Sequence, residues 1–221
     1  MNRKINKIAV IGSGVMGSGI ACHFANIGIE VVLLDIAPNK LNDNENKLGL
    51  SLDDKKVKNR IVNEMFQRCI KSKPAPLYHK TFSKRVELGN LTDDLSKISD
   101  VDWIIEVVTE KLNIKQIVFD QIEKFRSPGT LVTSNTSGIP IKQMNEGRSE
   151  DFRKNFAVTH FFNPPRYLKL FEIIPGPDCD PKIIDFLNDF GERFLGKDFV
   201  LAKDTPGFIG NRIGTFGMVN I

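Results

Sequence analysis

The chain has 221 residues, of which 41% are hydrophobic, so it can bury a substantial core and fits one large domain or one domain with part of another. Its 31 basic and 27 acidic residues give a net charge of only +4, and the lysines are scattered among acidic residues, so no nucleic-acid partner is expected. The three cysteines form no CxxC pair, which argues against a disulfide framework or a thiolate metal site and fits a reducing cytoplasm.

The N-terminus carries positive charge, but the apolar run after it is broken by glycines and has no small-residue cleavage site. We therefore expect no signal peptide. No run approaches the roughly 18 apolar residues of a membrane-spanning helix. These features predict a cytoplasmic protein that does not use a membrane as a partner.

The first elements follow one another in a regular order. A short apolar run, Lys7–Ile11, has the composition of a buried strand, and a glycine-rich loop, Gly12-Ser13-Gly14-Val15-Met16-Gly17, follows it directly. Apolar residues then recur at helical spacing as far as Gly28, a plausible C-cap. A second apolar run, 31–34, ends at Asp35. Together these segments predict a strand, a loop, a helix and a strand within about thirty residues.

The next sixty residues are less regular. The stretch 38–73 is charged and largely helical in pattern, and we favour a helix with one buried stripe and a solvated basic face over a phosphate site. The predicted stripe consists of residues four positions apart: Val57, Ile61, Met65 and Cys69. Between 77 and 100 we expect only a turn at Gly89-Asn90 and a short helix over 91–98.

Regular alternation returns in the second half of the chain. Strands are expected at 102–108, 130–133, 156–160, 170–174 and 199–202, and a helix at 181–194. Another helix follows the first of these strands, with its predicted inner side formed by Ile114, Ile117, Val118, Ile122 and Phe125. Alternating helices and nearly continuous apolar strands predict an α/β fold with a Rossmann-like, doubly wound, mostly parallel sheet.

The C-terminal residues predict the beginning of another unit. After Asp204-Thr205-Pro206-Gly207 an apolar helix begins, with little chain left for it to pack on before Ile221. We therefore divide the chain into a Rossmann-like domain, 1–205, and a segment, 206–221, that holds a linker and the first helix of a helical C-terminal domain. We expect the chain to be a fragment of a longer protein.

The glycine loop follows a strand and opens a helix, which is the setting of a dinucleotide site. Its first glycine permits the tight turn, its second lets the backbone approach a pyrophosphate, and its third lets helix and strand pack closely. Asp35 can accept hydrogen bonds from ribose hydroxyls and would repel a 2′-phosphate, so NAD is favoured over NADP. We disfavour the alternative that the glycines serve packing alone. The residues assigned to the cofactor here are Gly12, Gly14, Val15, Met16, Gly17 and Asp35.

His160 is the most plausible proton acceptor, although a lone histidine at a strand end is often only a satisfied structural residue. A carboxylate bonded to one ring nitrogen would hold the imidazole in one tautomer and stabilise the imidazolium. Glu172 is a candidate for that role, but its spacing fits an exposed carboxylate equally well. The polar residues 134–138 follow a strand, where they could bind the nicotinamide or the substrate or form an ordinary turn. No nucleophile elbow, zinc site or P-loop is recognisable.

In combination, these motifs resemble the NAD-binding part of the L-3-hydroxyacyl-CoA dehydrogenases of fatty-acid β-oxidation. The residues that carry the resemblance are VIGSGVMGSGIA, LLD at Asp35, SNTSGI from Ser134, HFFNP from His160, KLFEII around Glu172 and KDTPGFIGNR from Lys203. The order and spacing are also similar to those of a bacterial multifunctional form in which the dehydrogenase precedes an enoyl-CoA hydratase-like region. The resemblance covers nearly the whole chain and is weak over 39–100.

The resemblance implies NAD-dependent oxidation of an L-3-hydroxyacyl-CoA to a 3-ketoacyl-CoA. His160 would be the catalytic base and Glu172 the carboxylate that orients it. Ser137 and Asn211 would lie near the reacting hydroxyl and the nicotinamide. The residues expected near the nicotinamide half of the cofactor are Glu110 and Lys115, to which we add Asn135 from the polar stretch.

The resemblance also has implications for partners. The family's helical C-terminal domain carries the dimer contact and part of the acyl-CoA site, and this chain lacks nearly all of it. We therefore expect an acyl-CoA substrate, a dimer formed by the full-length protein, and NAD binding with poor turnover by the isolated chain.

Two other functions stay open at this point. A β-hydroxyacid dehydrogenase also has a GxGxxG loop followed by Met-Gly, but it would be expected to use a lysine base rather than a histidine with a glutamate. A dinucleotide-binding structural or sensor protein would keep the fold and bind NADH. It would not reduce a 3-ketoacyl-CoA even with the missing domain restored.

Overall fold

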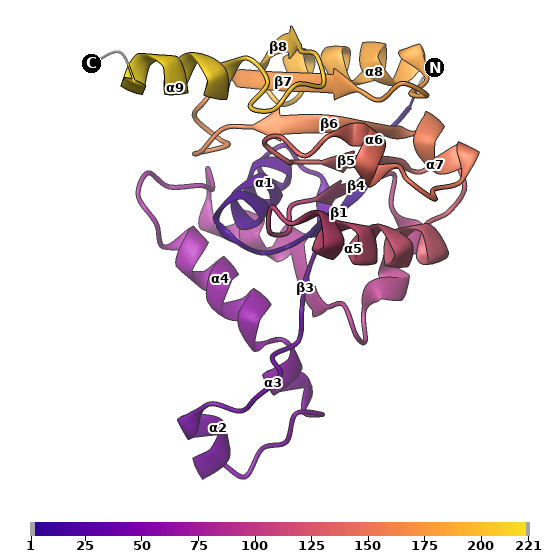
Figure 1. Cartoon of the computed structure of the whole chain (residues 1–221). Helices are drawn as coiled ribbons and strands as arrows, with labels where there is room; N and C mark the ends of the chain where they lie inside the picture. The colour runs from indigo at the N-terminus through magenta and orange to yellow at the C-terminus, as the bar shows by residue number, and fades with distance from the viewer. Residues whose placement is uncertain (1–2, 220–221) are drawn as a thin grey trace.

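A single sheet of eight strands forms the centre of the computed structural model, which describes residues 3–219 (Figure 1). The strands are β1 (Lys7–Ile11), β2 (Glu30–Asp35), β3 (Val86–Asn90), β4 (Trp103–Glu106), β5 (Leu131–Ser134), β6 (Phe156–Phe161), β7 (Leu170–Pro175) and β8 (Asp198–Leu201). Their order across the sheet is β3-β2-β1-β4-β5-β6-β7-β8. Neighbours are parallel except for β6 and β7, which are antiparallel.

Helices pack on both faces of this sheet. They are α1 (Val15–Asn26), α2 (Asp43–Lys47), α3 (Lys55–Lys58), α4 (Arg60–Ile70), α5 (Leu112–Phe125), α6 (Ile141–Met144), α7 (Glu150–Lys154), α8 (Pro181–Arg193) and α9 (Gly210–Val219). Short 3-10 helices, η1 (Lys80–Arg85) and η2 (Leu95–Asp100), lie before and after β3 in the sequence. In Figure 1, α2 and α3 extend away from the sheet beyond α4.

Residues of β1 alternate between two hydrophobic cores, one on each face of the sheet. Ile8 and Val10 share a core with apolar residues of α1 and α8, whereas Ala9 and Ile11 share the other with residues of α5. All four side chains are fully buried, because helices cover both faces of a parallel sheet. The Rossmann-like, doubly wound and mostly parallel sheet predicted from the sequence is therefore confirmed.

The topology brings several strand ends to one edge of the sheet. β1, β4, β5 and β6 run in the same direction, so the residues that follow them meet at a common carboxyl edge, where such folds bind ligands. β7 returns in the opposite direction, and this register places Glu172 opposite His160. The glycine loop, the end of β4 and residues 134–138 all lie at the same edge.

The expected turn at Gly89-Asn90 is wrong, because both residues belong to β3. They pair with Leu34 and Asp35 of β2. The side chain of Asn90 is fully buried, and it accepts hydrogen bonds from the backbone that follows the strand. Asn90 therefore ends a strand rather than forming a turn within a loop. The helix expected over 91–98 is instead the 3-10 helix η2, which begins later.

The single helix with one buried stripe expected within 38–73 is also wrong. The stretch contains three separate helices, α2, α3 and α4. Val57 is buried as predicted but lies in α3. The side chains that α4 buries are Val62 and Phe66, whereas Ile61, Met65 and Cys69 are only half-buried. The buried stripe of α4 therefore lies one position later than predicted.

The inner face of α5 differs from the prediction in a similar way. Val118 and Ile122 are buried as expected, but Ile117 is 55% exposed and Phe125 is 37% exposed. Phe119 and Lys115 are buried in their place. The burial of a lysine on this face has consequences for the site.

The C-terminal helix α9 begins within the predicted segment 206–221, whose last two residues lie outside the described part of the chain. The division into two domains stays a prediction. Among residues 3–219, none of the helices combines the length and the apolar character needed to cross a membrane. The same residues contain no group of three or more histidine, cysteine, aspartate or glutamate side chains suited to a metal ion.

Candidate active site

Two glycines of the loop between β1 and α1 are required by the fold itself. Gly12 has a φ of +103°, and a Cβ atom on it would lie 2.6 Å from the carbonyl oxygen of Val107. A Cβ on Gly17 would lie 1.7 Å from the carbonyl oxygen of Gly12. At Gly14, in contrast, no atom of the described chain other than its sequence neighbours and the nearby backbone lies within 4 Å of the equivalent position. Gly14 therefore leaves room for a ligand rather than for a neighbouring element.

The first turn of α1 lies at this opening. Gly14 is its N-cap residue, and no side chain within residues 3–219 caps this helix end. The first N–H groups of an α-helix have no partner inside the helix, so they can bind an anion, which the helix dipole also attracts. Val15 is 69% exposed here and Met16 is half-buried. These residues fit the pyrophosphate of a dinucleotide.

Asp35 ends β2 beside the glycine loop and is bonded to it. Its Oδ2 accepts hydrogen bonds from the backbone N–H of Ser13 at 2.6 Å and from the Ser13 hydroxyl. Its Oδ1 accepts one from the N–H of Ile36 at 2.7 Å. Ser13 thus fixes the orientation of the carboxylate. A carboxylate offers about four lone-pair positions, so half-buried Asp35 can still accept hydrogen bonds from ribose hydroxyls.

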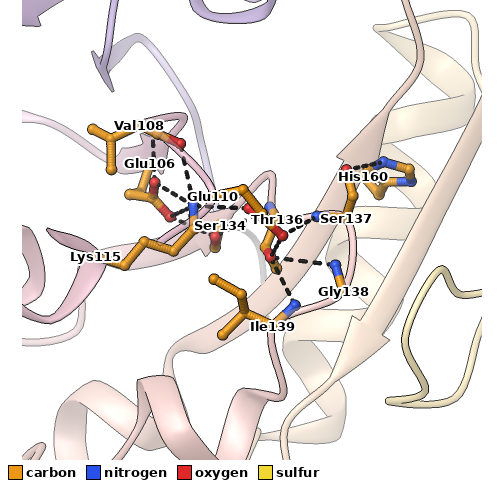
Figure 2. Close-up of polar contacts among 10 residues, drawn as sticks. All are labelled: Glu106, Val108, Glu110, Lys115, Ser134, Thr136, Ser137, Gly138, Ile139 and His160. Atoms are coloured by element: carbon orange, nitrogen blue, oxygen red, sulfur yellow. Dashed lines mark hydrogen bonds and ion pairs between the residues drawn. The ribbon is translucent and has the colours of Figure 1, made fainter. Parts of the chain in front are cut away.

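A buried ion pair lies behind these loops (Figure 2). Nζ of Lys115 on α5 lies 2.7 Å and 3.0 Å from the two carboxylate oxygens of Glu106, at the end of β4. The side chains are 1% and 0% exposed. The hydroxyl of Ser134 also donates to Glu106, and Oε2 of Glu110 lies 3.5 Å from Nζ of Lys115. Lys115, expected near the cofactor, therefore lies beneath the surface, where it holds two carboxylates.

Glu110 links this ion pair to the loop that follows β5. Its Oε1 accepts hydrogen bonds from the hydroxyl of Thr136 and from the N–H of Ser137, the latter at 2.9 Å. Figure 2 shows Ser137 directed from this loop toward His160. The Ser137 hydroxyl lies 3.2 Å from Nε2 of His160. A continuous series of polar contacts therefore runs from Lys115 to His160.

His160 and Glu172 form a buried pair between β6 and β7. Nδ1 of His160 lies 2.7 Å from Oε2 of Glu172, and the two side chains are 5% and 0% exposed. Glu172 is therefore not the exposed strand-end carboxylate that its spacing in the sequence also allowed. The rings of Phe162 and Phe208 pack against the imidazole, with centroid distances of 4.6 Å and 5.5 Å.

The second oxygen of Glu172 has partners that the sequence did not indicate. Oε1 accepts hydrogen bonds from the backbone N–H groups of Ile209 at 2.9 Å and Gly210 at 2.7 Å. These are backbone groups at the start of α9, so no side-chain type could have revealed them. Thr136 belongs to the polar stretch 134–138, which was expected to bind the nicotinamide or the substrate or to form a turn, and its hydroxyl donates to Glu110. Glu106, at the end of an apolar strand, received no definite role from the sequence.

The three asparagines near the site have different surroundings. Oδ1 of Asn135 accepts a hydrogen bond from the N–H of Phe161 at 2.9 Å, so this side chain ties the 134–138 loop to β6. Asn211 is half-buried in the first turn of α9. Asn163, which received no role from the sequence, lies with Gly14 on the wall of a cavity of about 150 Å³. It is therefore close to the cofactor loop.

The sequence model of one protein family, described as the NAD binding domain of 3-hydroxyacyl-CoA dehydrogenase, matches residues 7–205. The chain belongs to this family. A probable 3-hydroxyacyl-CoA dehydrogenase from Bacillus subtilis is 52% identical over 219 residues, which are 99% of this chain and 28% of that protein. One from Deinococcus radiodurans is 44% identical over 216 residues, which are 98% of this chain and 58% of that protein.

Solved structures of the family share the fold. The crystal structure of (S)-3-hydroxybutyryl-CoA dehydrogenase from Ralstonia eutropha has a TM-score of 0.71 and 27% identity, with 98% of this chain and 70% of that chain covered. The chain is thus a 3-hydroxyacyl-CoA dehydrogenase NAD-binding domain, and the resemblance and the assignment of NAD made from the sequence are confirmed. It spans less than two thirds of the length of the two bacterial relatives.

Proposed function

We propose that the protein oxidises an L-3-hydroxyacyl-CoA to a 3-ketoacyl-CoA with NAD, as a step of fatty-acid β-oxidation, and that this chain is the cofactor domain of a longer enzyme. The observation that carries the proposal is the buried pair of His160 and Glu172, with 2.7 Å between Nδ1 and Oε2. It lies at the same sheet edge as a glycine loop that fits a dinucleotide. Membership of the family supports the same reaction.

In this proposal the acid–base chemistry belongs to His160. Its Nδ1 faces a carboxylate, which accepts hydrogen bonds only, so the neutral ring carries its proton on Nδ1 and leaves Nε2 as the acceptor. Nε2 takes the proton of the 3-hydroxyl, and Glu172 stabilises the imidazolium that results. When bound, NAD supplies the acceptor for the hydride that leaves the same carbon. Burial of the pair excludes water and strengthens these electrostatic effects.

The other site residues would bind the cofactor or orient the substrate. The glycine loop, with Gly14 and the first turn of α1, would hold the pyrophosphate, and Asp35 the adenosine ribose. Ser137 would contact the reacting hydroxyl, since its own hydroxyl lies 3.2 Å from Nε2 of His160. Asn211 would face the substrate or the nicotinamide from α9. Glu110 and Asn135 would line the nicotinamide half, with Lys115 acting through Glu110.

The partners we propose are an acyl-CoA substrate and a second copy of the full-length protein. We propose the substrate because the family is one of 3-hydroxyacyl-CoA dehydrogenases. We propose the dimer because the resemblance implies a helical C-terminal domain that carries the dimer contact. We also propose a cytoplasmic location, which the three free cysteines support.

The test is NADH oxidation with acetoacetyl-CoA as the probe. It should be measured on this chain alone and on a fusion that adds the segment following the matched region in the B. subtilis relative. We expect activity in the fusion, and a loss of roughly 10²–10⁴-fold in kcat in the fusion with His160→Ala, because a positioned acid–base group contributes about that much. The dissociation constant of NADH should hardly change in this variant.

Other outcomes would reject parts of the proposal. A fusion that binds NADH and never oxidises it with acetoacetyl-CoA would favour a structural or sensor protein. Activity on a short β-hydroxyacid but not on the CoA ester would favour a β-hydroxyacid dehydrogenase. Equal kcat in the parent and in His160→Ala would remove His160 from the mechanism.

A further inference from the structure

The start of α9 provides the hydrogen bonds that hold the base-orienting carboxylate. Glu172 is fully buried, and Oε1 accepts the N–H groups of Ile209 at 2.9 Å and Gly210 at 2.7 Å. Its other oxygen is bonded to His160. A buried carboxylate is costly unless it is hydrogen-bonded, and a helix N-terminus stabilises negative charge. The backbone at the start of α9 therefore fixes the position of the Glu172 carboxylate.

The residues at the start of α9 also contact Ser137 and His160. The N–H of Gly207 donates to the carbonyl oxygen of Ser137 at 3.1 Å. The ring of Phe208 packs on His160 with a centroid distance of 5.5 Å and is itself 2% exposed. Four consecutive residues, 207–210, thus contact the serine, the imidazole and the carboxylate.

The backbone of 207–210 has a shape that few sequences would adopt. Gly207 has a φ of 78°, and Phe208 has a φ of 45°, in the left-handed region that residues with a side chain rarely occupy. A Cβ on Gly210 would lie 2.7 Å from Cζ of Phe162, whose ring packs on His160. Gly210 therefore permits two things at once, the short bond to Glu172 and the close packing of Phe162.

We propose that residues 207–210 form a clamp that positions the His160–Glu172 pair, and that Gly210 is the positioning residue on which the clamp depends. The proposal rests on the proposed function, in which this pair supplies the base. It implies that the placement of α9 is coupled to the geometry of the base. A shift of this helix would withdraw both N–H groups from Glu172 together.

The test compares Gly210→Ala with Gly214→Ala. Both variants place the same methyl group on α9. At Gly214, apart from its sequence neighbours and the nearby backbone of α9 itself, no atom of the described chain lies within 4 Å of the position that the methyl group would take. In the fusion described above, we expect Gly210→Ala to lower kcat by roughly 10- to 100-fold, since a displacement of up to about 1 Å in a catalytic group has effects of this size. The affinity for NADH should stay the same, and Gly214→Ala should match the parent.

A second measurement does not depend on activity. In this chain labelled with ¹⁵N-histidine, the Nδ1 proton of His160, bonded to a carboxylate at 2.7 Å, should give a downfield NMR signal. We expect that signal to move upfield or vanish in Gly210→Ala and to persist in Gly214→Ala. If the fusion has no dehydrogenase activity, the proposed function fails, whereas this signal still tests the clamp.

Two further variants separate positioning from general damage. Phe162→Leu removes the ring carbons that the new methyl group would meet and leaves only Leu170 Cδ2, at 3.1 Å, close to it. Adding Phe162→Leu to Gly210→Ala should therefore restore part of the signal and of kcat. In a Glu172→Gln background, Gly210→Ala should cause little additional loss, because its effect passes through Glu172. An unchanged signal and kcat in Gly210→Ala, or a full additional loss in the Glu172→Gln background, would overturn the proposal.

Discussion

Lys115 shows how a residue can be important for the site while lying beneath its surface. An ammonium group has three protons, and Nζ of Lys115 donates hydrogen bonds to both carboxylate oxygens of Glu106 and to the carbonyl oxygen of Val108 at 3.4 Å. It also forms an ion pair with Glu110 at 3.5 Å. With 1% exposure, the side chain has almost no surface to offer a ligand. Its effect on the site passes through Glu110, which holds the loop of Ser137.

We predict that Lys115→Met destabilises the protein by about 3–5 kcal/mol, because it leaves the fully buried carboxylate of Glu106 without its counterion. Urea unfolding at neutral pH measures this change. The matched control is Lys124→Met, an exposed lysine of the same helix, which should stay within ~0.5 kcal/mol of the parent. Adding Glu106→Gln to Lys115→Met should recover part of the loss. A Lys115→Met protein as stable as the parent would contradict the assignment.

Among the helices and strands, those that could be predicted are the ones whose own side chains form a recognisable sequence pattern. The unit β1, α1 and β2 was located to within a residue or two, since its glycines and apolar runs leave few alternatives. The pair of His160 and Glu172 followed from the strand pattern and the resemblance. β3 was missed because Gly89-Asn90 has the composition of a turn, whereas Gly89 is there because a Cβ would lie 2.6 Å from Oδ2 of Asp94.

Other elements depend on what surrounds them. The apolar residues of α4 fit two adjacent stripes, and the positions of α1, β2 and β3 decide which one is buried. The contacts of Ile209 and Gly210 with Glu172 are made by backbone N–H groups, which every residue except proline has. No local pattern in the sequence could distinguish these two from their neighbours.

The glycines of the loop between β1 and α1 should differ in what their substitution changes, because Gly17 is needed for packing and Gly14 for ligand space. Gly17→Ala should destabilise the protein by about 1–3 kcal/mol or more, since the new methyl group would meet the carbonyl oxygen of Gly12. Gly14→Ala should leave stability within about 0.5 kcal/mol. It should nevertheless weaken NADH binding by about tenfold or more, equivalent to ~1.4 kcal/mol, because the methyl group would occupy the space a pyrophosphate needs. Thermal melts and fluorescence titration with NADH give the two quantities, and tight binding by Gly14→Ala would refute the assignment.

Across the whole molecule, a buried histidine connects α1 to the segment that follows α8, and a buried lysine connects that segment to the loop between β6 and β7. Nε2 of His23 on α1 lies 3.0 Å from the carbonyl oxygen of Leu195, which follows α8. Nζ of Lys197 donates to the carbonyl oxygens of Pro165 and Leu168. Burial lowers the pKa of Lys197 to about 8. Burial, together with the positive charge of Lys197, lowers the pKa of His23 to about 4.

His23 should therefore make the stability of the protein depend on pH. An unfolded histidine titrates near pH 6.5, so between about pH 6.5 and 4 the unfolded chain binds the proton and the folded chain does not. Stability must fall as the pH is lowered through this window, by roughly 2–3 kcal/mol from this residue. In the folded state, Nδ1 of His23 has no hydrogen-bond partner within residues 3–219, which makes the charged form costlier still.

The measurement is the free energy of unfolding in urea at pH 7 and pH 4.5. His23→Gln can keep a donor toward the carbonyl oxygen of Leu195 but cannot take up the proton. When the pH falls from 7 to 4.5, the free energy of unfolding should fall by about 2–3 kcal/mol less in this variant than in the parent. Carboxylates titrate in both proteins, so their contributions cancel in this comparison. If the parent and His23→Gln lose equal stability on acidification, the buried histidine does not control the acid limit, and the carboxylates alone account for it.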